Sequence, residues 1–180
     1  LLLALQAHPV YKLVIAANRD EFYARPTTPA GFWDGRPDIL AGRDLQAGGT
    51  WFGITRKGRI GAITNYRDPS SHKSAAPSRG RLVSDFLTGE EAPEAYLSRL
   101  ELSAGDYNGF NLVVGIRDHL CWHSNRGLGI QRIIPGIHGL SNHLLNTPWP
   151  KVSRAKAALK DILSNNPVLS PGVLFDMLLD

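Results

Sequence analysis

Short apolar runs joined by tight turns constrain the fold of this chain more than any other feature. Three pairs of runs have the length of β-strands: Leu1–Ala7 with Lys12–Ala17, Thr50–Thr55 with Arg59–Thr64, and Asn111–Ile116 with Leu120–Ser124. Strands joined by short turns pair in antiparallel fashion, so these runs predict three β-hairpins. A further short strand is expected over Arg132–Ile134.

Helical patterns lie between and after the predicted hairpins. Ser78 is expected to cap a helix over Arg79–Leu87 that ends before Gly89. Other helices are expected over Pro93–Leu100, from Val152 to Leu163, and over Pro171–Leu179. Hairpins combined with helices that each have an apolar face predict an α+β fold of antiparallel sheets covered by helices.

Two segments are predicted to be loops. Ala24–Gly49 is rich in glycine and proline and is expected to form a long ordered loop, a kind of segment that often carries function. Asn65–Pro77 is polar and is expected to be a second loop.

Composition excludes several classes of protein. The 180 residues are 43% hydrophobic with a net charge of +4, and no apolar stretch approaches the ~18 residues of a membrane span. No run of basic residues indicates nucleic-acid binding. One cysteine allows no internal disulfide and favours a reducing, cytoplasmic location. We expect a single domain over residues 1–180, truncated at both ends because the chain begins at Leu1 and has Met177 as its only methionine.

Polar residues gather where the predicted strands end. Four clusters share this position: Asn18-Arg19-Asp20-Glu21, Gly48-Gly49-Thr50-Trp51, Thr64-Asn65-Tyr66-Arg67 and Gly139-Leu140-Ser141-Asn142. If the strand continued through the first cluster, Asn18 and Asp20 would share one face and Arg19 and Glu21 the other. An arginine beside a carboxylate lowers the carboxylate pKa and orients both groups. The alternative is an ordinary solvated ion pair at a strand end.

Two asparagines are candidates for stabilising an oxyanion. Asn65 and Asn142 each follow a strand and offer a side-chain amide as a hydrogen-bond donor. The alternative for both is a structural role in a turn. Gly48-Gly49 permits a close approach of backbone to a ligand, or equally a hairpin bulge.

Known metal and nucleotide signatures are absent from the sequence. No His-Glu-x-x-His, P-loop or Gly-x-Gly-x-x-Gly pattern occurs, so no metal and no nucleotide cofactor is expected. No Gly-x-Ser-x-Gly motif indicates a serine hydrolase. Cys121 lies between Leu120 and Trp122 and is expected to be a packed core thiol rather than a nucleophile.

Several short blocks follow one another in a fixed order along the chain. These blocks are Ala17-Asn18-Arg19-Asp20-Glu21-Phe22, Ala41-Gly42-Arg43-Asp44, Gly48-Gly49-Thr50-Trp51-Phe52-Gly53, Thr64-Asn65-Tyr66-Arg67, Ser78-Arg79-Gly80, Tyr107-Asn108-Gly109-Phe110-Asn111 and Gly139-Leu140-Ser141-Asn142. Together they resemble the NRDE family of transport and Golgi organisation proteins. The resemblance runs from Leu1 to about Trp149. It implies a four-layer αββα sandwich like that of the N-terminal-nucleophile hydrolases.

The resemblance also implies a mechanism. Family members typically begin Met-Cys directly before the strand that corresponds to Leu1, and in related hydrolases such a cysteine attacks an amide carbonyl while its own α-amine acts as base. The residues Leu1–Ala7 include no Cys, Ser or Thr, so we expect that a Met-Cys pair, absent from this sequence, precedes Leu1 and that its cysteine hydrolyses a small amide or ester. The resemblance then implies that Asn18, Arg19 and Asp20 orient the reacting groups and that Asn65 and Asn142 donate to the oxyanion. Thr50, Trp51, Arg79 and His138 are the expected substrate-binding residues.

A non-catalytic role stands as the alternative. Animal relatives are linked to Golgi organisation, lipid metabolism and haem handling, which implies an acyl or porphyrin ligand in place of the small amide that the hydrolase-like fold implies. An apolar pocket rimmed by Trp33, Trp51 and Phe52 would suit acyl chains or a porphyrin. His138 and His143 are the candidates for an axial haem ligand. The oligomeric state is not indicated by the sequence.

Overall fold

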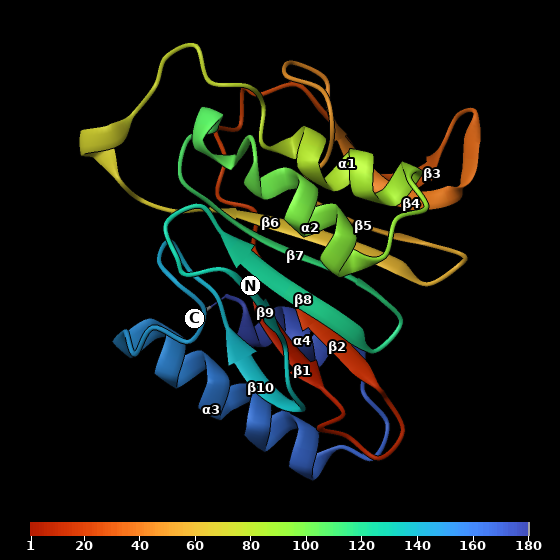
Figure 1. The fold of residues 1–180 in the computed structure, drawn as a ribbon. Helices are drawn as coiled ribbons and strands as arrows, with labels where there is room; N and C mark the ends of the chain where they lie inside the picture. The colour runs from red at the N-terminus through yellow and green to blue at the C-terminus, as the bar shows by residue number, and fades with distance from the viewer. Residues whose placement is uncertain (180) are drawn as a thin grey trace.

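The computed structural model describes residues 1–179, and its strands form two antiparallel sheets (Figure 1). The smaller sheet has the order β10-β1-β2. Its strands are β1 (Leu2–Leu5), β2 (Leu13–Ala16) and β10 (Gly136–Gly139). The larger sheet has seven strands in sequence order: β3 (Thr27–Trp33), β4 (Arg36–Asp44), β5 (Phe52–Thr55), β6 (Arg59–Asn65), β7 (Phe110–Ile116), β8 (His119–Ser124) and β9 (Ile130–Arg132).

Helices cover the outer face of each sheet. Within the described residues the α-helices are α1 (Gly80–Thr88), α2 (Pro93–Glu101), α3 (Pro150–Asn165) and α4 (Pro171–Met177). Figure 1 shows α1 and α2 over the seven-stranded sheet and α3 and α4 below the small one. The predicted α+β class and four-layer αββα order are therefore confirmed.

Three apolar clusters hold these layers together. The first packs α1 and α2 against the large sheet around Phe86 and Phe110, and the second joins the two sheets around Leu3 and Leu120. The third packs Leu159 and its neighbours on α3 against the outer face of the small sheet. Every residue of β1 is buried, because its alternate side chains belong to the second and third clusters.

The three predicted hairpins are confirmed as β1–β2, β5–β6 and β7–β8, and the four predicted helices are confirmed as α1 to α4. The cap of α1 differs from the prediction, because Arg79 occupies the N-cap and no side chain caps the helix. Ser78 instead donates its hydroxyl to the carbonyl of Gly48 at 3.5 Å. The short strand predicted over Arg132–Ile134 begins earlier, as β9.

The prediction that Ala24–Gly49 is a loop is wrong. Most of this segment forms β3 and β4, which pair in antiparallel fashion and turn at Gly35 with a positive φ of 74°. The prolines favoured a loop in the sequence analysis. However, β3 is an edge strand, where the missing N–H of Pro29 removes no hydrogen bond that the sheet needs. Asn65–Pro77 does lack strands beyond its first residue and holds a single short 3₁₀ turn at Pro69–Ser71.

None of the helices within residues 1–179 is long and apolar enough to cross a membrane.

Candidate functional site

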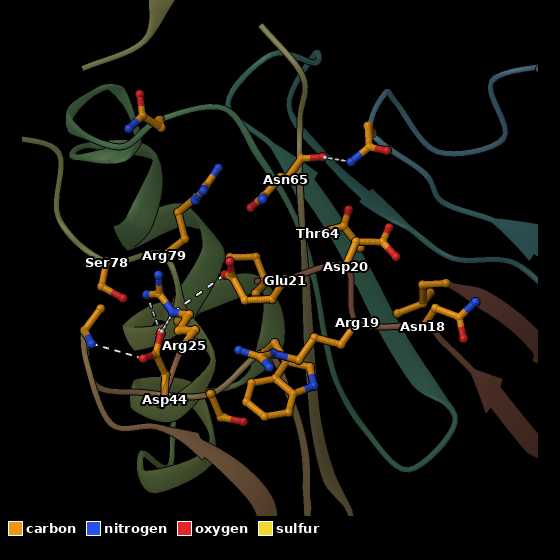
Figure 2. Close-up of a pocket in the computed structure, with 18 of the residues that line it drawn as sticks. Asn18, Arg19, Asp20, Glu21, Arg25, Asp44, Thr64, Asn65, Ser78 and Arg79 are labelled. Carbon is orange, nitrogen blue, oxygen red and sulfur yellow. Dashed lines mark hydrogen bonds and ion pairs between the residues drawn. The ribbon is translucent and has the colours of Figure 1, made fainter. Parts of the chain in front are cut away.

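A polar pocket of about 410 Å³ lies where the two sheets and the start of α1 meet. Residues from all four sequence clusters line it, although they come from the ends of four different strands. Figure 2 shows Arg25, Asp44, Ser78 and Arg79 on one side of the pocket and the residues that follow β2 on the other. The fold therefore converts four dispersed polar clusters into one cavity.

Asn18, Arg19 and Asp20 follow β2 but do not continue it. The strand ends at Ala16, so the predicted alternation of Asn18 and Asp20 against Arg19 and Glu21 is wrong. Each side chain instead takes its own direction: Asn18 donates to the carbonyl of Leu178 at 2.7 Å, and the Arg19 guanidinium lies 4.2 Å from the centre of the Trp51 ring. A cation over an indole face is attracted by the ring quadrupole, so Trp51 holds Arg19 against the pocket wall.

The strongest ion pair in the pocket joins Arg25 to Asp44, neither of which the sequence analysis assigned to the site. Nε and Nη2 of Arg25 donate to one oxygen of Asp44 at 3.1 and 2.7 Å, and Glu21 lies 3.6 Å from Arg25. Partial burial alone would raise the pKa of Asp44. Hydrogen bonds from Arg25 and from the backbone amides of Ala47 and Gln46 outweigh it and lower that pKa. The sequence feature that could have indicated this pair is the carboxylate of Asp44, which ends the Ala41–Asp44 block.

Arg79 carries its charge into the pocket without a carboxylate partner. Its Nη1 donates to the carbonyl of Gly109 at 2.9 Å, and no acidic side chain within residues 1–179 forms an ion pair with Arg79 or with Arg19. Burial lowers the pKa of Arg79, while the charge of Glu21 acts in the opposite direction. A partly buried guanidinium with unused N–H groups is suited to bind an anion.

Two glycines bring the loop before β5 against the start of α1. Gly49 has a φ of 82°, and a Cβ there would lie 2.4 Å from the carbonyl carbon of Gly80. The adjacent N–H of Thr50 donates to the carbonyl of Gly80 at 3.1 Å. The buried Thr50 hydroxyl donates to the carbonyl of Phe52, so Thr50 supports the pocket wall from behind. This contact places Arg79 beside the pocket.

The two candidate oxyanion asparagines lie together. Asn142 donates its side-chain amide to the backbone carbonyl of Asn65 at 3.4 Å. The side-chain amide of Asn65 faces the pocket in Figure 2, at the end of β6. Of the two side chains, Asn65 thus has its amide available to a ligand, whereas Asn142 holds the two strand ends together.

The backbone of Leu1 reaches the same cavity. Its nitrogen donates to the carbonyl of Leu140 at 2.9 Å and the N–H of Leu140 donates back to Leu1 at 2.8 Å, so the pairing of β1 with β10 extends to the pocket. Asp20 lines the same cavity as Leu1, so its negative charge lies near this end of β1.

Four residues named by the sequence analysis lie apart from this pocket. His138 is buried in β10 and both of its ring nitrogens are hydrogen-bonded, one to the carbonyl of Ile134 and the other to Asn146. His143 is hydrogen-bonded to Thr147. Trp33 packs in the cluster beneath α1, and Phe52 packs between the sheets, so the expected aromatic rim of Trp33, Trp51 and Phe52 is not formed.

A separate group of metal-ligand types lies across α2 and β8. Ligand atoms of Glu94, His119 and Cys121 all lie within 4.8 Å of one another. Cys121 is buried as predicted, and burial together with Glu94 raises the pKa of its thiol to about 12. A thiol this hard to ionise is a poor nucleophile, and Glu94 and His119 already bond to each other.

Comparison with known proteins identifies the family. The family model described as Transport and Golgi organisation 2 matches residues 1–180. This chain belongs to that family. It is 41% identical to the mouse "Transport and Golgi organization 2 homolog" and 40% identical to the human "Transport and Golgi organization protein 2 homolog", each over 179 residues and 94% of this chain. The fruit-fly "Transport and Golgi organization protein 2" is 29% identical over 170 residues.

The resemblance seen in the sequence is thus confirmed at the level of the family. The chain spans 64% of the length of the mouse and human relatives and 59% of the fruit-fly one.

We predict that Gly49→Ala destabilises this family member far more than Gly48→Ala. Both glycines have a positive φ, which costs an alanine roughly 1–2 kcal/mol. At Gly48 the nearest atom to an added Cβ is the flexible Arg81 side chain at 3.9 Å, whereas at Gly49 it is the backbone of Gly80. Urea denaturation should show an extra loss of about 1–3 kcal/mol for Gly49→Ala. Equal losses in the two variants would contradict the close packing.

Asp44 should make stability depend on pH in the acid range. Because the folded-state pKa is lowered, the ionised carboxylate stabilises the fold above its unfolded pKa of about 3.9. This contribution is lost as the pH falls through the folded value. The free energy of unfolding of Asp44→Asn should therefore fall below that of the unmodified protein at pH ~7, and the gap should shrink by pH ~3.

The control for this measurement is Asp34→Asn, which changes an exposed carboxylate in the turn between β3 and β4. Urea denaturation of this variant should match that of the unmodified protein at both pH values. A constant gap for Asp44→Asn across the pH range would contradict the assignment.

Proposed function

We propose that the polar pocket binds a small amide or ester that carries a negative charge, and that a cysteine directly before Leu1 cleaves it. The observation that carries this proposal is the position of the Leu1 nitrogen, at the pocket and near Asp20. Since Leu1 and Leu140 exchange both backbone hydrogen bonds, a residue before Leu1 would extend β1 opposite Ser141. That residue would enter a cavity that already holds candidate groups for acyl transfer.

The chemistry follows that of an N-terminal nucleophile. The α-amine of the cysteine accepts the thiol proton, and the thiolate adds to the substrate carbonyl carbon. The side-chain amide of Asn65 is available to donate to the resulting oxyanion. Collapse of this intermediate breaks the C–N or C–O bond, and the leaving group departs with the proton from the amine. Water then hydrolyses the thioester and restores the thiol. Asp20 raises the proton affinity of the amine.

The charges around the pocket favour an anionic substrate. Three arginines and three carboxylates line it, so its formal charges balance, but both Asp44 and Glu21 lie on Arg25. Arg19 and Arg79 remain as cations without an ion-pair partner among the described residues. An acyl compound with a carboxylate or phosphate would give these guanidinium groups a charged partner that the ion pairs of the pocket do not supply.

Carriage of haem or of a bare acyl chain receives less support from this cavity. The residues that line it are mostly polar or charged, and neither His138 nor His143 is among them. A porphyrin in this cavity would need an axial ligand. His138 has both ring nitrogens hydrogen-bonded, and His143 lies outside the cavity. Binding without catalysis, by contrast, needs only Arg19 and Arg79. It is the expected function if the N-terminal cysteine proves unreactive.

The nucleophile is tested by limiting alkylation of the full-length protein at pH 7. We expect iodoacetamide to modify a processed N-terminal cysteine about tenfold faster than a free thiol, because its pKa is lowered by the local base. Buried Cys121 should stay unmodified and serves as the internal control. Asp20→Asn should slow the labelling. An unprocessed N-terminus, or a cysteine no more reactive than a free thiol, would refute the hydrolase and leave the binding function.

The preference for an anion is tested with two reagents that differ in charge. The ratio of the labelling rate with iodoacetate to that with iodoacetamide should exceed the ratio for a small thiol in solution. Arg79→Gln should lower this ratio about tenfold, which corresponds to the loss of one charge-assisted hydrogen bond. Arg36→Gln is the matched control, because Arg36 lies outside the pocket on β4. An unchanged ratio in Arg79→Gln would contradict the anionic substrate.

A further inference from the structure

The small sheet ends in an open edge at β2. Its order is β10-β1-β2, so β2 pairs with β1 on one side and with no strand of residues 1–179 on the other. The N–H of Gln6 donates to the carbonyl of Lys12, next to the strand, and hydrogen bonds alternate along an antiparallel pair. The N–H groups of Leu13 and Ile15 consequently point to the open edge. A row of unpaired groups of this kind is a template for another strand.

An apolar row runs across the large sheet beyond this edge. Ile60, Ile54, Leu40 and Phe32 are successive cross-strand partners on β6, β5, β4 and β3, so their side chains share one face. Ile60 belongs to the cluster between the sheets and is 8% exposed. Exposure rises to 39% at Ile54 and 51% at Phe32. The small sheet covers the beginning of this row. Farther along, Leu40 is half-buried and the Arg56 guanidinium lies 4.3 Å from the centre of the Phe32 ring, while Ile54 and Phe32 stay partly exposed to solvent.

A groove joins the open edge of β2 to the apolar row of the large sheet. It has a volume of about 590 Å³ and is lined by Leu13 and Ile15 of β2 and by Phe52, Ile54 and Ile60 of the large sheet. Leu13, Ile15, Phe52 and Ile60 belong to the cluster that packs the two sheets together, and Ile54 lies next to it as the cross-strand partner of Ile60. The groove therefore lies at the edge of the apolar core between the two sheets, where that core is incompletely covered. Its lining residues differ from those of the polar pocket.

The end of α4 lies beside the end of β2. Asn18, two residues beyond β2, donates its side-chain amide to the carbonyl of Leu178 at 2.7 Å. A polypeptide that continues from this point needs only a few residues to run back antiparallel along β2. The matched 179 residues make up 64% of the mouse relative, so about 100 residues of a full-length family member lie outside the match.

We propose that the segment following α4 in the full-length protein adds strands to β2 and covers the groove. Neighbouring strands lie about 4.8 Å apart, so the row from Ile60 to Phe32 spans roughly 14 Å and needs two or three added strands. About 100 residues suffice for that number. The side chains that these strands direct toward the large sheet are apolar, because they face Ile54, Leu40 and Phe32. The sandwich is thereby completed by strand addition at β2.

Hydrogen exchange of the full-length protein tests the pairing. The amides of Leu13 and Ile15 should exchange at least 100-fold more slowly than the amide of the exposed Val10, which donates only a local hydrogen bond to the His8 ring. Protection should be the same in dilute and concentrated samples, since the strand comes from the same molecule. Rapid exchange of Leu13 and Ile15 would overturn the proposal. Protection that disappears on dilution would assign the groove to a second copy and would also overturn it.

A pair of substitutions tests whether added strands cover the apolar row of the large sheet. In the full-length protein, Ile54→Asp should lower the melting temperature by several degrees, because the new carboxylate would be buried beneath the added strands. Leu128→Asp is the matched control, since Leu128 is 90% exposed in the turn after β8 and touches neither groove nor row. Equal melting temperatures for the two variants would overturn the proposal even if both fold normally.

Discussion

Burial of β1 on both faces is the constraint on which the rest of the molecule depends. Leu3 and Leu5 pack between the sheets while Leu2 and Ala4 pack against the helices below, so neither face of this strand meets water. A strand covered on both faces cannot slip by one residue without moving an apolar set into the other cluster. Its register fixes the position of Leu1, and with it the backbone nitrogen that reaches the polar pocket.

Among the described residues, the pocket contains both an ion pair and arginines that have no carboxylate partner. The Arg25–Asp44 pair is satisfied within the protein and acts as a rigid wall, whereas Arg19 and Arg79 keep their charge available. A binding site for a small anion requires charged groups that are available and already held in place. Such groups lose little further conformational entropy when the anion binds.

Much of the fold was predictable because it rests on local patterns. Apolar runs of strand length, turns at glycine and helical apolar stripes identified three hairpins and four helices, all of which are present. The failure at β3 and β4 has a physical reason: Pro29 and Gly31 weaken a strand in isolation, but an edge strand tolerates them once β4 pairs with it. The capping role expected of Ser78 failed because its hydroxyl bonds to the neighbouring loop instead.

The candidate site was predictable in its residues and not in its arrangement. Polar clusters at strand ends named most of the pocket, yet Arg25 and Asp44 were missed because an ion pair 19 residues apart has no local signature. His138 was expected in the site, and the register of β10 turns it toward Ile134 and Asn146.

The sequence by itself determined the fold class, the membership of the Transport and Golgi organisation 2 family and the identity of the polar clusters, because these depend on the order and type of residues. Only the tertiary structure decided which clusters meet, which arginines stay unpaired and which edge of the small sheet stays open. Those outcomes depend on sheet order and strand register, which arise from contacts between residues far apart in the chain.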